Sequence, residues 1–160
     1  NHVLEHVNDP LSFLRDVRRV MRPGGIAHIC VPNVECPEAR LSGWVSFEPY
    51  HLLYFTPATL AATVSRTGLT IARSGTKESF SGWMLAVART AMRRHRAPTS
   101  LTEIPAPLSA SPARRPPWFE HAYRLTSVAV GAATWPLRRL QARLGFGDEI
   151  ICVARRPRED

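Results

Sequence analysis

Residues 9–33, DPLSFLRDVRRVMRPGGIAHICVPN, predict a helix over 9–22 and a strand over 26–31. Asp9-Pro10 is a strong helix start, because aspartate caps the first free N–H groups and proline lacks the N–H that is not needed there. Apolar residues recur at helical spacing from Leu11 to Met21, and Pro23-Gly24-Gly25 ends the helix. The strand is mostly apolar, which is typical of a strand inside a sheet that is covered on both faces.

The same order of helix and strand recurs further along the chain. Thr56-Pro57 starts a second helix that ends near Gly68, and Leu69 to Arg73 predicts a second strand. A loop rich in aromatic residues, 34–55, joins the two units, and Glu149 to Ala154 predicts a last strand. Alternating helices and strands favour a layered α/β fold.

The second half of the chain has a different character. We expect a helix over 83–96, a proline-rich linker over 97–117, and a long helix over 118–144 that is interrupted at Gly131 and Pro136. The apolar centre of the long helix is shorter than the ~20 residues that span a bilayer. The arginines that follow would let residues 118–144 lie on a membrane surface, whereas packing against the domain is the simpler alternative.

Charge and cysteine content narrow the classes of protein. The 160 residues fit one domain, and the net charge is +8. Residues 1–90 have nine basic and seven acidic side chains, whereas residues 91–160 have twelve and six, so most of the excess lies in the second half. That half could contact phosphates or an anionic membrane, or be an ordinary solvated surface. Three cysteines without CxxC spacing argue against a disulfide framework and favour a reducing cytosol.

Several short motifs occur together in a fixed order. They are Leu4-Glu5-His6-Val7-x-Asp9-Pro10, Phe13-Leu14, Arg22-Pro23-Gly24-Gly25, Val31-Pro32-Asn33, His51-Leu52-Leu53-Tyr54-Phe55-Thr56-Pro57, Thr67-Gly68-Leu69 and Gly147 to Ala154. With these motifs in this order, the chain resembles class I S-adenosylmethionine-dependent methyltransferases, and more narrowly the branch that includes ubiquinone-biosynthesis O-methyltransferases and other small-molecule methyltransferases. The likeness covers residues 1–75 and about 147–156.

The resemblance implies the C-terminal part of a Rossmann-like seven-stranded sheet, whose last strand is antiparallel. It places Asn1 and His2 at the end of the fourth strand and makes the strands at 26–31, 69–73 and 149–154 the fifth, sixth and seventh. Residues 77–146 become a helical, proline-rich insertion between a first part, 1–76, and the closing strand and tail, 147–160.

The resemblance also implies S-adenosylmethionine as cofactor, bound at the carboxyl ends of the parallel strands. The family's glycine-rich loop follows a strand, whereas Gly24-Gly25 follows a helix. We therefore expect this chain to be the C-terminal part of a cytoplasmic methyltransferase, with an apolar strand edge that needs a partner. By itself it should not bind the cofactor measurably.

Candidate site residues come from the opening of the chain and from the aromatic loop. Asn1, His2, Glu5 and His6 are expected to line the cofactor pocket, although Glu5 and His6 could instead orient the loop and cap the next helix. His51 is the candidate general base for a small-molecule acceptor, or else a loop histidine with a structural hydrogen bond. The candidates for the wall of the acceptor pocket are Trp44, Tyr50 and Tyr54.

Three other interpretations compete with this one. His2-x-x-Glu5-His6 fits the HxxEH pattern of inverted zinc peptidases, but it lies before the helix that such a site needs, and we predict no metal. A parent protein that keeps the fold without catalysis is the second. Association with a membrane surface or with nucleic acid through the basic half is the third. We expect no nucleic acid as a partner, and peripheral membrane contact through 118–144 is the alternative to packing against the domain.

Overall fold

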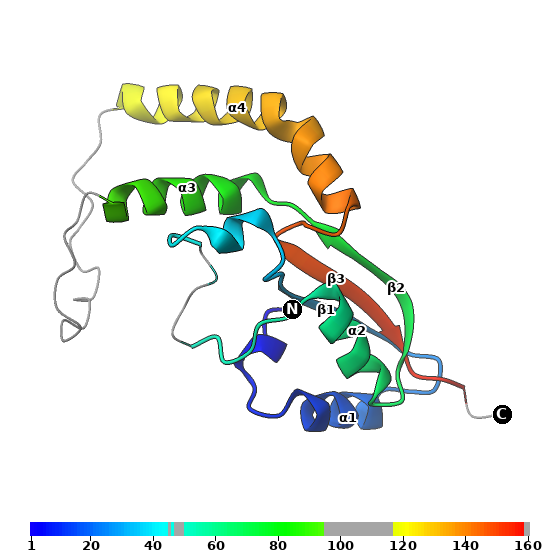
Figure 1. Ribbon diagram of the computed structural model, residues 1–160. Helices are drawn as coiled ribbons and strands as arrows, with labels where there is room; N and C mark the ends of the chain where they lie inside the picture. Colours follow the sequence, from blue (N-terminus) through cyan, green and yellow to red (C-terminus); the bar gives the residue numbers. More distant parts are fainter. Residues whose placement is uncertain (45, 47–49, 95–116, 159–160) are drawn as a thin grey trace, which may run out of the picture.

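The computed structural model of the protein describes residues 1–44, 46, 50–94 and 117–158. The predicted linker at 97–117 lies outside these residues except for Pro117, which begins a helix. Figure 1 shows a small sheet with helices packed beside it, and two longer helices that extend away from it. In chain order the elements are η1 (Leu4–His6), α1 (Pro10–Val20), β1 (Ile26–Pro32), η2 (Pro37–Arg40), α2 (Pro57–Ser65), β2 (Thr70–Lys77), α3 (Phe80–Arg94), α4 (Pro117–Arg143) and β3 (Glu149–Arg155).

The sheet has three strands in the order β1-β3-β2. β3 is antiparallel to both neighbours, with Ile29 opposite Cys152 on one side and Ile71 opposite Ala154 on the other, so β1 and β2 are parallel to each other. The expected strand positions and the antiparallel last strand are therefore present. The larger seven-stranded sheet stays a prediction.

β1 lies at an edge of this sheet, as the resemblance implied. The first residues of the chain lie beside that edge, where the His2 N–H donates to the Cys30 carbonyl at 2.8 Å. Ile26 on the same strand is 65% exposed. The edge is thus both apolar and only partly paired.

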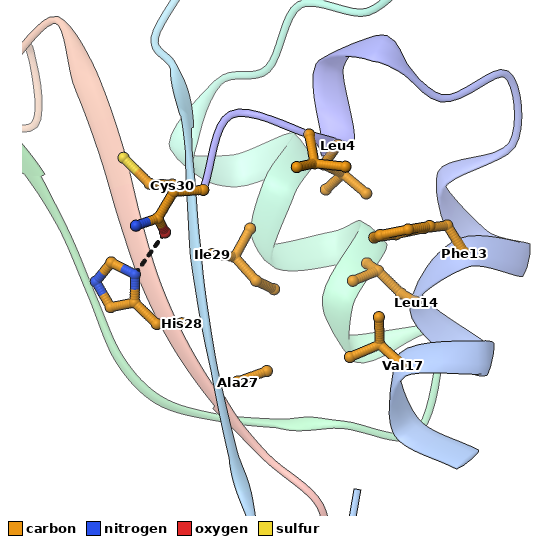
Figure 2. A pocket seen from close by; sticks show the side chains of 10 residues that line it. Leu4, Phe13, Leu14, Val17, Ala27, His28, Ile29 and Cys30 are labelled. Carbon is orange, nitrogen blue, oxygen red and sulfur yellow. Dashed lines mark hydrogen bonds between the residues drawn. The ribbon is translucent and has the colours of Figure 1, made fainter. Parts of the chain in front are cut away.

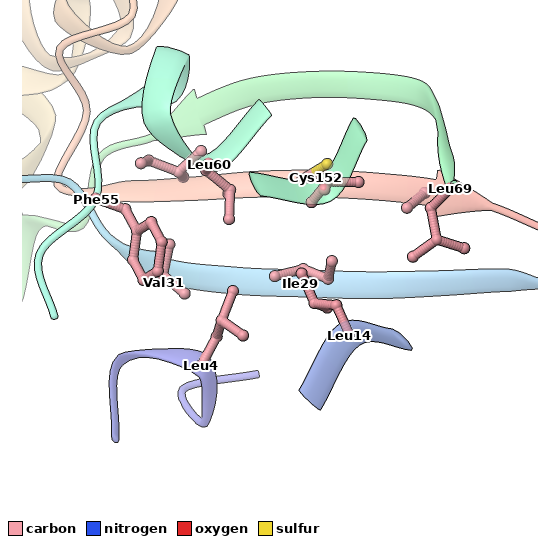
Figure 3. Close-up of a cluster of buried hydrophobic side chains, with 11 residues drawn as sticks. Leu4, Leu14, Ile29, Val31, Phe55, Leu60, Leu69 and Cys152 are labelled. Atoms are coloured by element: carbon pink, nitrogen blue, oxygen red, sulfur yellow. The ribbon is translucent and has the colours of Figure 1, made fainter. Parts of the chain in front are cut away.

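The core lies between one face of the sheet and the helices α1 and α2. Figure 3 shows Leu14 of α1 and Leu4 of η1 directed at Ile29 and Val31 of β1. The apolar stripe of α1 predicted from its spacing thus packs on the sheet. The remaining buried members of this core are Phe55, Leu60, Val64, Leu69, Ile150, Cys152 and Ala154.

The opposite face of the sheet is more open than expected. Burial alternates along β3, and on β1 the His28 side chain is exposed. The prediction of a strand covered on both faces holds for the second half of β1, where Ile29 to Pro32 are all buried. The first half of β1 is open on the face away from α1 and α2, because both helices pack on the same face.

The predicted helix caps are confirmed. The Asp9 carboxylate accepts from the N–H groups of Leu11 and Ser12 at 3.0 Å. Thr56 and Thr59 form a reciprocal capping box at the start of α2. Gly68 ends that unit in the left-handed region, with φ of 77°. Neither Glu5 nor His6 caps α1, because Asp9 fills that position, so the capping part of that alternative was wrong. The other part is confirmed, since both residues make hydrogen bonds to the loop.

Three elements differ from the sequence prediction. α3 begins at Phe80 rather than at residue 83. β2 continues to Lys77 rather than ending at Arg73, because its polar second half pairs with β3 after a bulge between Ile71 and Arg73. α4 runs through Gly131 and Pro136 as one helix instead of being interrupted. Proline inside a helix removes one hydrogen bond and bends it without ending it, and Figure 1 shows α4 curving along its length.

Candidate functional site

A pocket of about 240 Å³ opens where β1 ends and β3 begins. Pro32 closes β1 and Ser79 follows β2, so the pocket lies at the carboxyl ends of the two parallel strands. Ligands of open α/β sheets bind at such ends. The lining residues are His2, Pro32, Ser46, His51, Ser79, Gly82, Leu85, Asp148 and Glu149.

His51 lies in this pocket with a defined tautomer. Its Nδ1 is 2.8 Å from the Ser46 carbonyl oxygen, and a carbonyl can only accept, so Nδ1 carries the proton. In the neutral ring Nε2 is then an acceptor, and it has no hydrogen-bond partner among the described residues. The ring also lies 4.7 Å from the ring of His6, which fixes its orientation.

His2 is the second histidine of the pocket, and its backbone is unusual. Its φ of 50° lies in the left-handed region, which is costly for a residue with a side chain. The imidazole lies between two carboxylates, with Nδ1 3.3 Å from Glu5 and Nε2 3.6 Å from Glu149. Such a strained residue, held between acids at a pocket, is a candidate for function.

Glu5 is completely buried behind His2. Neither of its carboxylate oxygens has a hydrogen-bond partner among the described residues, and the His2 contact lacks hydrogen-bond geometry. Buried carboxylates normally have partners, so these two acceptors are exceptional. The Glu5 backbone has a separate role, because its carbonyl accepts from the N–H groups of Leu52 and Leu53 and so anchors the loop that carries His51.

His6 and Asn1 lie outside the pocket lining in the described residues. His6 Nδ1 is 3.0 Å from the Tyr50 carbonyl and helps to orient the loop. Asn1 is 2.7 Å from His28 Nδ1 and lines a different, apolar pocket between α1 and β1. Figure 2 shows this second pocket, with Phe13, Leu14 and Val17 of α1 facing β1. Of the four predicted cofactor residues, the structure therefore places only His2 in the pocket with His51.

The three predicted aromatic wall residues lie around the loop but not in the pocket lining. Trp44 is only 2% exposed and packs in a small cluster with Cys36 and Ala86. Tyr54 lies 6.2 Å from the Trp44 ring, and Tyr50 makes an edge contact with His51 at 5.2 Å. Only Trp44 of the three is buried, whereas Tyr50 and Tyr54 are exposed.

Two groups of side chains in the described residues are close enough to share a metal ion. In one group the ligand atoms of Glu5, His6 and His51 lie within 4.8 Å of one another, and in the other those of His2, Cys30 and Glu149 do. The second group is a poor ligand set, because burial and the negative charge of Glu149 raise the pKa of the Cys30 thiol to about 11.

A buried acidic cluster beside the pocket was missed from the sequence. Asp148 accepts from the Ser79 N–H at 3.0 Å and from its hydroxyl at 2.6 Å. Gln141 of α4 donates to both Glu38 and Glu78. Burial, and then the charges of Asp148 and Glu38, raise the pKa of Glu78 to about 8. These acids are far apart in sequence, so only the fold brings them together.

Comparison with known proteins agrees with the geometry of the first half. Residues 1–74 match the sequence model of a family described as "Methyltransferase domain". This part of the chain is therefore similar to methyltransferase domains. The match ends inside β2 and so contains η1, β1, the aromatic loop and His51.

The similarity of the chain to a solved structure is more distant. The chain is similar to the crystal structure of the [4+2]-cyclase SpnF, with 17% identity and a TM-score of 0.44 over 98% of this chain and 47% of that one. The chain thus spans about half the length of that structure, and this likeness carries no argument about activity. No curated protein matches the sequence.

Proposed function

We propose that this chain is part of an S-adenosylmethionine-dependent enzyme that methylates a hydroxyl group of a small molecule, with His51 as the general base. One observation carries the proposal: His51 holds a free Nε2 in a pocket at the carboxyl ends of β1 and β2. The match of residues 1–74 to a methyltransferase domain supports the reaction class. The ubiquinone-biosynthesis branch and a cytoplasmic location belong to the same proposal.

The cofactor would be held on one side by the opening of the chain. S-adenosylmethionine supplies a methyl group on a sulfonium when bound. The exposed imidazole of His2 stands between the buried Glu5 carboxylate and the pocket, so that a ligand in the pocket would meet His2 and not Glu5. We assign His2 to cofactor contact and Glu5 to positioning His2. The glycine-rich side of such a site is absent from these 160 residues, where Gly24-Gly25 follows α1.

The residues of the pocket account for the proton movement. The Ser46 carbonyl fixes the tautomer of His51, so that Nε2 can accept the proton of an acceptor hydroxyl. The Glu5 carboxylate, within 4.8 Å, stabilises the positive charge that His51 then gains. Pro32 and Leu85 supply apolar walls that exclude water and hold the acceptor close to the base.

The test is methyl transfer by the protein expressed with the sequence that is encoded upstream of Asn1. Labelled S-adenosylmethionine is offered with phenolic and sugar acceptors. The variants are His51→Asn, which can still donate to the Ser46 carbonyl but has no acceptor in place of Nε2, and His51→Ala.

We expect both variants to lower kcat by about 100-fold or more, while calorimetry gives unchanged affinity for the cofactor. Unchanged kcat would remove His51 from the mechanism. Cofactor binding without transfer to any acceptor would favour a protein that keeps the fold without catalysis, and a lack of cofactor binding would overturn the proposal.

A further inference from the structure

We propose that the outward face of α4 docks on the surface of an anionic lipid bilayer. The proposal is independent of the reaction at the pocket. It rests on which side of α4 faces the protein, on the charge of the other side, and on a hollow in its surface.

The side of α4 that faces the protein is polar. Gln141 donates to the carboxylates of Glu38 and Glu78, and the Ala142 carbonyl accepts from the Thr76 hydroxyl at 2.7 Å. Arg138, one turn before, lies close enough to Glu78 to lower its pKa against the effects of burial. Where its side chains are described, α4 is therefore attached to the sheet by hydrogen bonds and charge.

The side of α4 that faces away from the protein is apolar. Leu140 is 53% exposed and Leu137 is 67% exposed. Trp135, at 51% exposure, lies at the border of this side, where it and Arg139 also line a pocket beside β2. This arrangement is the reverse of an ordinary surface helix, whose apolar side packs on the core. Exposed apolar side chains gathered along one helix mark an interaction surface. The other large exposed apolar residues in and just after α4 are Leu125, Val128, Val130 and Leu144.

The charges on the outward face select the partner. Arg139 and Arg143 are exposed, and the Arg139 guanidinium lies over the Trp135 ring at 4.9 Å. Residues 121–147 contain no aspartate or glutamate. Two copies of this face would bring arginines together without an acid to pair with them, whereas lipid phosphates would neutralise them.

The shape of the outward face fits a lipid headgroup. A shallow hollow lies on α4 between the two arginines, and its lining residues are Trp135, Pro136, Arg139, Leu140 and Arg143. Tryptophan prefers the interface between water and lipid, and arginine stems lie along apolar surface while their heads reach phosphate. In the described part of the chain, no helix is long and apolar enough to cross a membrane, so α4 would lie in the plane of the bilayer surface.

Vesicle flotation with the 160-residue chain tests this proposal. The vesicles are phosphatidylcholine with or without phosphatidylglycerol. We expect flotation only with phosphatidylglycerol, and weaker binding as salt is added. Arg139→Glu/Arg143→Glu should lower the affinity by about 30-fold or more, since each surface cation contributes a factor of about five. Trp135→Ala should weaken binding without changing the need for anionic lipid.

The control is Arg15→Glu/Arg66→Glu, which makes the same charge change on exposed arginines of α1 and at the end of α2. It should bind nearly as the unchanged chain does, with melting curves showing that all variants fold. The proposal is overturned by no flotation with anionic vesicles, or by equal losses in both double variants. A dimer in sedimentation that Arg139→Glu/Arg143→Glu dissociates, without vesicle binding, would assign the face to a second copy instead.

Discussion

The sheet with α1 and α2 and the long helix α4 use apolar residues in opposite ways. In the first region Leu14, Leu60 and Ile150 are buried almost completely, and the polar residues of the helices face water. In α4, Leu137 and Leu140 face water while Gln141 faces the protein. Hydrophobicity alone therefore does not determine burial. The difference indicates that the first region is stabilised by its own core, whereas the exposed apolar residues of α4 are available to a binding partner.

The largest expected effect is in the core. Ile150 lies on the central strand with no exposed surface. Ile150→Ala should lower the free energy of unfolding by about 3 kcal/mol, because it removes buried methylene groups and leaves a cavity. Urea unfolding followed by circular dichroism measures this loss. A loss below about 1 kcal/mol would mean that the sheet is not the stable part of the molecule.

A smaller effect is expected where the start of β3 meets the end of β1. The buried Asn33 amide donates to the carbonyls of Gly145 and Gly147, at 3.1 and 2.7 Å. Asn33→Ala leaves both carbonyls without this donor and should cost about 2 kcal/mol in the same unfolding experiment. Asn8→Ala, at an exposed asparagine, is the matched control and should cost little. Equal losses in the two variants would contradict this role.

The acidic cluster that holds α4 should make stability depend on pH. The pKa of Glu78 is raised to about 8, so the folded protein keeps a proton that the unfolded chain, with a value near 4.5, has released. Stability should therefore fall as pH rises from about 4.5 to about 8 and change little above that. The raised pKa of Asp148, caused by burial, acts in the same direction.

Glu78→Gln removes this charge while keeping an acceptor for the Asp148 N–H and for Gln141. Because Glu78 is partly exposed, we expect a gain of only about 1 kcal/mol near pH 9 and almost none near pH 5. Melting curves across this range measure it. A variant that is destabilised equally at every pH would show that the carboxylate is needed in its charged form.

The smallest effect is expected on the outward face of α4. Leu140→Gln/Leu144→Gln replaces two exposed leucines, at 53% and 62% exposure, by another good helix former. The free energy of unfolding should change by less than about 0.5 kcal/mol. Leu60→Gln, the same change at a core position, should by contrast be strongly destabilising. A large loss from the α4 pair would show that this face is covered within the folded chain.

The sequence predicts the first region well because its signals are local. Asp9-Pro10 and Thr56-Pro57 start helices at the positions where the structure starts them, and Gly68 ends its unit. The polar end of β2 has no such signal, because pairing with β3 about seventy residues later decides it. The predicted interruption of the long helix at Pro136 was wrong, because a proline bends a long helix without dividing it.

The candidate site was predictable only in part. His51 and His2 were named from the sequence, and the structure brings both into one pocket. Trp44 was named as a pocket wall, but it is buried in a cluster of its own. The acids around Gln141 could not have been found, because no spacing in the sequence brings positions 38, 78 and 148 together.

The most direct test of the division between a self-contained sheet and an outward-facing α4 is hydrogen exchange with and without anionic vesicles. We predict that vesicles slow amide exchange in α4, around Trp135 to Leu144, and leave β1 and β3 unchanged. If vesicles slowed exchange in the sheet but not in α4, or changed exchange nowhere, this division between the sheet and α4 would be contradicted.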